Sequence, residues 1–253
     1  MTEDLDDTKA PLLEHLIELR NRLLWSICAF ALAFGVCLYF SKPTFTVLVR
    51  PLLMAGQGKL IYTDIFEAFF VELKVAFFAA LMLAFPVFAI QAWKFIAPGL
   101  YTNEKKAFLP FLLLTPVLFA MGASLAYFFA MPVALHFLLG YSGDFGGVTS
   151  EALPAIGNYL DFVTKFIFGF GVAFLLPVLL VLLEMVGIVT RQQLSDGRRY
   201  AIVGAFAIAA VLTPPDVVSQ LLLAVPLVIL YEFALLGIWF NEKRRGKTMV
   251  PVE

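Results

Sequence analysis

Residues that could perform covalent or metal chemistry are few and scattered in this sequence. The two histidines, His15 and His136, are far apart, and no cysteine lies near either of them. Cys28 and Cys37 fall in one apolar stretch, at a spacing that would place them on opposite sides of a helix and prevent a disulfide. No nucleophile elbow, zinc-protease motif or phosphate-binding loop is found. We therefore expect no catalytic centre, metal site or cofactor, and the chain is not predicted to be an enzyme.

Acidic residues close to basic ones are the more informative groups, and the first lies near the amino terminus. Between Pro11 and Leu23, leucines recur at helical spacing on one face, and acidic, amide and basic side chains line another. This pattern predicts an amphipathic interfacial helix that leads into an apolar span and exposes Glu18. The alternative for Glu18 is an ion pair with Arg22, four residues later on the same helix, worth about 0.3–0.5 kcal/mol.

The second carboxylate of interest, Glu104, follows a predicted turn. Pro98 and Gly99 favour that turn, and Asn103 could cap the helix that begins after it. Glu104 would lie in the first turn of this helix, where the helix dipole favours an acid by roughly 0.3–1 kcal/mol. The dipole alone would therefore explain an acid at this position.

The composition indicates the kind of element that must position these side chains. The 253 residues are 61% hydrophobic and 15% charged, with a mean hydropathy of +0.90, whereas a soluble domain carries about 25% charged residues. The excess apolar surface must face lipid, and a net charge of −1 gives no reason to expect nucleic-acid binding. We predict one membrane domain over 1–253, with an amphipathic amino terminus (1–22), a membrane body (23–240) and a tail (241–253). The first apolar run lacks a cleavage site and others follow it, so a removable signal peptide is not expected.

Six apolar stretches predict membrane-spanning helices, because backbone groups in lipid must pair within the segment. They are Leu23–Phe40, Phe70–Ala92, Phe108–Met131, Phe162–Gly187, Tyr200–Leu212 and Val217–Phe240. The fifth is short, and the prolines of Thr213–Asp216 force a tight reversal. The fifth and sixth spans therefore predict a short hairpin that either stops partway across the membrane or, as we favour, thins the bilayer locally. Prolines inside other spans, such as Pro86 and Pro177, predict kinked and tilted helices that form a cupped body. Small residues at Gly122, Ala126 and Ala130 favour close helix packing.

The placement of basic residues predicts the orientation of these spans. Most of the 18 basic residues belong to one set of flanks: Lys9, Arg20, Arg22, Lys94, Lys105, Lys106, Arg191, Arg198, Arg199, Lys243, Arg244, Arg245 and Lys247. Both termini and the loops at 93–106 and 188–199 are therefore predicted to be cytoplasmic. On the other side we expect a short helix over Thr44–Arg50, a helix start capped by Asp64, and a turn over Gly143–Gly147.

Several of these segments together resemble one protein family. The run HLIELRNRL at 15–23 is similar to the amino-terminal signature of TatC, the twin-arginine translocase receptor family, and FIAPGLY at 95–101 with Glu104 is similar to its first cytoplasmic loop. The segment LTPPDV at 212–217 resembles the family's motif between the fifth and sixth spans, and 187–190 and 199–200 also fit. The resemblance covers nearly the whole chain in the same order, with the same span count and orientation.

The resemblance implies a function in protein export. Proteins of this family bind twin-arginine signal peptides of folded precursors in the bacterial inner membrane, associate with TatA, TatB and further TatC copies, and use the proton-motive force. By position, Glu18 and Glu104 would be the carboxylates that bind the two signal arginines, with Arg20 and Phe95 in the same patch. Partner or structural roles are assigned to Pro51, Tyr127, Glu184, Asp216 and Glu232. The competing class, a small-solute transporter or channel, would need a polar cavity at mid-membrane, for which the chain offers few residues.

One position departs from the family pattern. Family members carry a polar residue in the fourth span just before the proline, whereas this chain has Leu175 before Pro177. Glu184, nearer the cytoplasm, either replaces that polar contact or extends to the interface. For Glu232 in the sixth span, contact with a partner helix and extension to the interface are equally compatible with the sequence.

Overall fold

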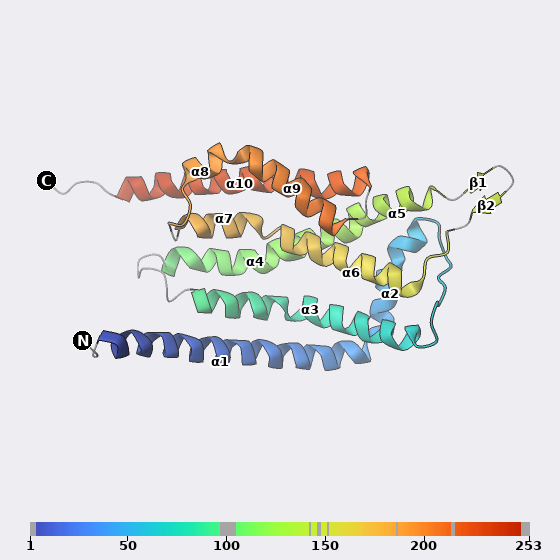
Figure 1. The fold of residues 1–253 in the computed structure, drawn as a ribbon, viewed down its shortest axis with the longest axis horizontal. Helices are drawn as coiled ribbons and strands as arrows, with labels where there is room; N and C mark the ends of the chain where they lie inside the picture. The colour runs from blue at the N-terminus through green and yellow to red at the C-terminus, as the bar shows by residue number, and fades with distance from the viewer. Residues whose placement is uncertain are drawn as a thin grey trace. The chain divides into compact units, whose positions relative to one another are not determined.

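The computed structural model describes residues 4–96, 105–141, 143–145, 148–150, 152–185, 187–213 and 216–248. These residues are almost entirely helical (Figure 1). The elements in chain order are α1 (Asp4–Tyr39), α2 (Ser41–Met54), α3 (Glu67–Ile96), α4 (Lys105–Leu125), the π-helix η2 (Ala126–Ala130), α5 (Met131–Leu139), β1 (Gly143–Phe145), β2 (Val148–Ser150), α6 (Ile156–Ala173), α7 (Leu176–Met185), α8 (Arg191–Asp196), α9 (Arg198–Leu212) and α10 (Val217–Thr248). The predicted all-α class is thus confirmed.

The chain divides into two compact units. The first combines Met1–Thr46 with Phe69–Pro116, and the second combines Val47–Ala68 with Val117–Glu253. All three boundaries fall within helices: α2 and α4 each begin in the first unit and end in the second, and α3 begins in the second unit and continues into the first.

The first unit is built on α1 and α3, which lie side by side (Figure 1). Phe30 packs edge to face on Phe77, with ring centroids 5.1 Å apart. Further along the pair, Cys37 and Ala80 belong to a buried cluster of small side chains, which permit close approach of the two helices. These contacts hold the carboxyl-terminal half of α1 against the amino-terminal half of α3.

The second unit has α6 at its core. Phe166 and Phe170 of this helix are fully buried. A Cβ added at Gly122 of α4 would lie 2.6 Å from the carbonyl oxygen of Phe170, so only glycine permits this approach. Ala126 and Ala130 are also fully buried. The small residues predicted to favour packing therefore do line a close helix–helix contact.

Prolines interrupt two of the long helices. At η2, the Met131 N–H donates to the carbonyl of Ala126, five residues back, and Pro132 follows at once. Because proline has no N–H to offer, the ladder widens to π geometry just before it. The break between α6 and α7 falls at Phe174 and Leu175, shortly before Pro177, where an interruption was predicted.

Five helical segments are long and apolar enough to cross a membrane: His15–Tyr39, Glu67–Phe95, Leu112–Leu139, Ile156–Met185 and Val217–Phe240. They coincide with five of the six predicted spans. The remaining one corresponds to α9, whose 15 residues measure about 22 Å at 1.5 Å per residue, less than the roughly 30 Å bilayer core. A total of six spans stays a prediction.

Three smaller predictions are refined. The helix expected over Thr44–Arg50 extends over Ser41–Met54 and includes both flanking prolines, because proline is tolerated within a first turn and removes only one hydrogen bond near the helix end. The Asp64 carboxylate accepts the Phe66 N–H at 2.8 Å, as expected for a cap. The turn predicted over Gly143–Gly147 lies partly outside the described residues; its first three residues form β1, which pairs antiparallel with β2, and neither strand was predicted.

Candidate functional site

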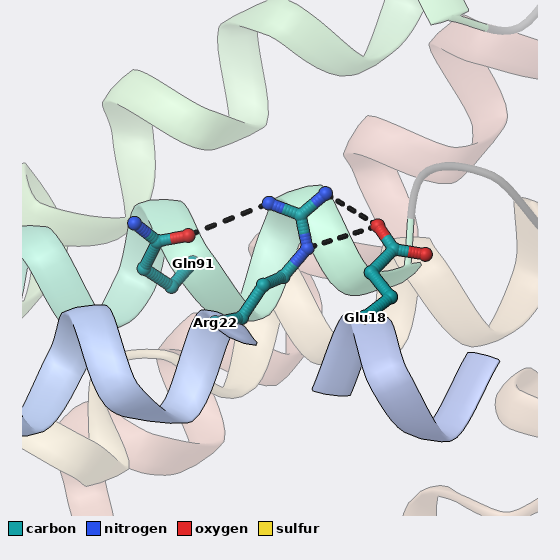
Figure 2. A network of polar contacts seen from close by, with 3 residues as sticks. All are labelled: Glu18, Arg22 and Gln91. Carbon is teal, nitrogen blue, oxygen red and sulfur yellow. Dashed lines mark hydrogen bonds and ion pairs between the residues drawn. The ribbon is translucent and has the colours of Figure 1, made fainter. Parts of the chain in front are cut away.

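The Glu18 carboxylate lies on α1 within a three-residue polar network (Figure 2). The Arg22 guanidinium donates from Nε, at 3.0 Å, and from Nη2 to the same oxygen, Oε1 of Glu18. The third nitrogen, Nη1, donates to the amide oxygen of Gln91 on α3 at 3.4 Å. The side chains of Arg22 and Glu18 remain 24% and 31% exposed. The ion pair that the i, i+4 spacing allowed is therefore present, and it is tied to the second helix of the unit.

Two adjoining depressions meet at this network. A polar pocket is lined by Ile17, Glu18, Asn21, Arg22, Trp25, Gln91 and Lys94. An apolar groove of about 560 Å³ continues from it along α1 and α3, lined chiefly by leucine, isoleucine and phenylalanine side chains that include Leu23, Phe30 and Phe88. Arg22 and Gln91 belong to both depressions. The first unit thus offers an acidic group beside an apolar groove. This combination suits a ligand that has a cationic group followed by an apolar segment.

Phe95 and Arg20 belong to the same end of the unit. The Phe95 ring stacks on the His15 ring, with centroids 4.3 Å apart and planes 19° apart. This contact places a rigid aromatic surface at the end of the groove, which Phe95 also lines. Arg20 is exposed, and its Nη2 donates to Asn21 Oδ1 at 3.4 Å. Among the described residues, the structure brings Glu18 and Phe95 to one pair of helices and leaves Arg20 open to solvent beside them.

Comparison with known proteins gives the family of this chain. The family model described as Sec-independent protein translocase protein (TatC) matches residues 14–226. The chain belongs to the TatC family. It is 50% identical over 243 residues to the TatC protein of Magnetococcus marinus, covering 95% of this chain and 88% of that one. It is 39% identical over 245 residues to the TatC protein of Escherichia coli, covering 96% and 92%.

Solved TatC structures share the fold. A crystal structure described as the twin arginine translocase receptor TatC superimposes with a TM-score of 0.74 at 41% identity, covering 88% of this chain and 96% of that chain. A second crystal structure, of the receptor in DDM, gives a TM-score of 0.75 at 40% identity. The resemblance stated from the motifs is confirmed: this is a multi-pass membrane protein of a translocase family, a transport component and not an enzyme.

Two motifs of the TatC resemblance lie partly outside the described residues. Glu104, the proposed second carboxylate, is outside them, as is most of the loop that precedes it. Pro214 and Pro215 are also outside, between α9 and α10. The roles assigned to Glu104 and Glu18 as a pair remain a proposal.

Pro51 and Tyr127 are connected through one carbonyl group. Pro51 lies in the last turn of α2 and has no N–H to donate to the carbonyl of Val47, four residues earlier. The Tyr127 hydroxyl on η2 donates to that carbonyl at 2.7 Å. The Tyr159 hydroxyl on α6 donates to the next carbonyl, that of Leu48, at 2.8 Å. Tyr127 therefore supplies the hydrogen bond that the proline removes, and this geometry supports the structural role proposed for both residues.

Asp216 and Glu184 lie at opposite ends of their helices. The Asp216 carboxylate accepts the Ser219 N–H at 2.6 Å and so caps α10. Glu184 is half-buried in the last turn of α7, and its main-chain carbonyl accepts the N–H of Gly187, whose positive φ of 77° ends the helix. Leu175 occupies the turn between α6 and α7. Glu184 is thus about two and a half turns from Leu175 along the helix axis, and its replacement of the missing polar contact stays a prediction.

Glu232 pairs within the chain. Both of its carboxylate oxygens contact the Arg198 guanidinium, at 3.0 Å each, in a two-pronged ion pair that is about half exposed. The Tyr231 hydroxyl donates to the carbonyl of Leu194 at 2.6 Å, and Arg191 pairs with Glu242 at 3.1 Å. These contacts fasten α8 and the start of α9 to α10. The role of Glu232 toward a partner, left open by the sequence, stays a proposal.

Gln91 and Lys94 were missed as site residues. The sequence did carry a signal for Gln91, because it is an amide within a long apolar run and lies four residues before Phe95, on the same helix face. No sequence pattern links it to Arg22, since the two residues come from different helices. Within the described residues, no group of three or more histidine, cysteine, aspartate or glutamate side chains could hold a metal ion.

Proposed function

We propose that this TatC-family protein is the receptor for twin-arginine signal peptides and the core scaffold of a Tat translocase that uses the proton-motive force. It would lie in the bacterial inner membrane with six spans and both termini in the cytoplasm. TatA, TatB and further copies of the chain would be its partners. The observation that carries the proposal is the Glu18 carboxylate beside an apolar groove in the first unit.

The chemistry of Glu18 supports arginine as the ligand. A guanidinium offers parallel N–H groups that match the two oxygens of a carboxylate, whereas an ammonium acts as a point charge. Glu18 already binds the guanidinium of Arg22 through two nitrogens. Glu104 would bind the second signal arginine, and Arg20 and Phe95 would border the patch. The apolar part of the signal would follow the groove along α1 and α3.

The test is the binding of synthetic signal peptides to the purified full chain in lipid nanodiscs. We expect a twin-arginine peptide to bind more tightly than its twin-lysine counterpart, because charge-assisted hydrogen bonds contribute roughly 1–3 kcal/mol for each arginine. Shortening the apolar part of the peptide should weaken both. Equal affinity for the two peptides would remove the proposed site. Export of a folded precursor by cells that carry only this TatC would test the scaffold role.

A further inference from the structure

Arg22 occupies the position that a ligand's guanidinium would take. Its Nε and Nη2 both donate to Glu18 Oε1. An incoming signal arginine would need hydrogen bonds to this same oxygen. A signal arginine that binds Glu18 with two parallel hydrogen bonds needs both carboxylate oxygens. It therefore cannot bind in this way while Arg22 stays in place.

Gln91 offers Arg22 a second acceptor. Its amide oxygen lies 3.4 Å from Nη1 of Arg22, on the side of the guanidinium that faces away from Glu18 (Figure 2). Gln91 and Arg22 both line the polar pocket and the apolar groove, so a small rotation of the guanidinium toward Gln91 would keep it in the same space. The displaced charge would keep a hydrogen-bond partner and would not be left unpaired in a partly buried position.

We propose that the Arg22 guanidinium binds Glu18 while the receptor is empty. When a signal arginine binds Glu18, Arg22 releases the carboxylate and its guanidinium is held by the amide oxygen of Gln91. This inference rests on the proposed function and adds two residues that set the affinity of its site. Removal of an internal competitor strengthens binding of every ligand that uses Glu18 by the same factor. For a pair at i, i+4, that factor is about two-fold.

The experiment measures affinities of a fluorescent twin-arginine peptide and its twin-lysine control for the purified full chain in nanodiscs. Arg22→Gln should strengthen binding of both peptides by about two-fold and leave their ratio unchanged. Gln91→Leu should weaken binding, because the displaced Arg22 loses its acceptor. Gln91→Glu should strengthen binding, because it draws Arg22 away from Glu18.

A double-mutant cycle separates this exchange from direct attraction between the peptide and a new acid. In the Arg22→Gln background, Gln91→Glu should have no further effect if Gln91 acts through Arg22. An undiminished effect there, or weaker binding by Arg22→Gln, would overturn the exchange. The Gln91 variants keep the test decisive if Arg22→Gln fails to fold. If the wild-type chain does not prefer the twin-arginine peptide, the proposed function fails. If the wild-type chain does prefer it, but Arg22→Gln and the Gln91 variants bind it with wild-type affinity, only the exchange fails.

Discussion

At the scale of residues, the candidate site depends on which carboxylates are left to bind a ligand. Glu232 binds Arg198 with both oxygens, whereas Glu18 accepts both of its hydrogen bonds from Arg22, those of Nε and Nη2, with a single oxygen. The pair at Glu18 is therefore the less complete of the two and the easier to exchange. This difference agrees with the assignment of Glu18 to the signal and of Glu232 to contacts between helices of the chain.

Replacement of Glu18 or Glu104 by alanine should abolish export while the chain still inserts into the membrane. Each substitution removes one charge-assisted contact to a signal arginine, so peptide affinity should fall by roughly 5- to 150-fold. Export of a reporter precursor and membrane levels of the chain are the two measurements. Glu242→Ala, which removes an acid outside the proposed site, is the matched control. Normal export by Glu18→Ala or by Glu104→Ala would show that the assignment of that residue is wrong.

At the scale of elements, α2 is attached to η2 through the carbonyl that Pro51 leaves unpaired. Tyr127→Phe removes only the hydroxyl that binds Val47, and should lower the unfolding free energy by about 1 kcal/mol. In a Pro51→Ala background the alanine N–H can bind Val47 instead, so Tyr127→Phe should have a smaller effect. Thermal unfolding of the four proteins in detergent measures the coupling. If Tyr127→Phe lowers the unfolding free energy equally in both backgrounds, Tyr127 and Pro51 are not coupled and the prediction is wrong.

The close approach of α4 and α6 gives a second prediction at this scale. Gly122→Ala would place a Cβ 2.6 Å from the Phe170 carbonyl, and overpacking of this kind costs typically about 1–3 kcal/mol. We expect a lower midpoint of thermal unfolding. Gly204→Ala in α9, where an added Cβ meets nothing within 4 Å, is the control and should be neutral or slightly stabilising. Indistinguishable midpoints for Gly122→Ala and the wild-type chain would contradict the packing argument.

At the scale of the whole molecule, the predicted topology places both termini in the cytoplasm. In a variant without Cys28 and Cys37, Lys59→Cys should react with a membrane-impermeant thiol reagent added outside the cell membrane. Ile188→Cys should react only after the membrane is opened, because the bias of basic residues predicts its loop to be cytoplasmic. Both positions are exposed in the structure. The reverse labelling pattern would show that the predicted orientation is wrong and that the proposed site does not face the cytoplasm.

The sequence determined the elements and the family of this protein. Long apolar runs had to become helices in lipid, and five of the six predicted spans coincide with helices that are long enough. The motifs at 15–23 and 95–101 identified the family that the comparisons then confirmed. Local rules also gave the Asp64 cap and offered the Glu18–Arg22 pair as the alternative for Glu18, because each depends on residues a few positions apart.

Only the tertiary structure decided which distant side chains meet. Arg22 reaches Gln91 from 69 positions away, and Tyr127 reaches the Val47 carbonyl from 80. Such contacts depend on the rotation and register of one helix against another, which many weak packing contacts fix together. The spacing of residues along the chain does not predict that register. The sequence therefore named a carboxylate on α1 and an arginine one turn away, and the folded helices brought the glutamine of α3 to that pair.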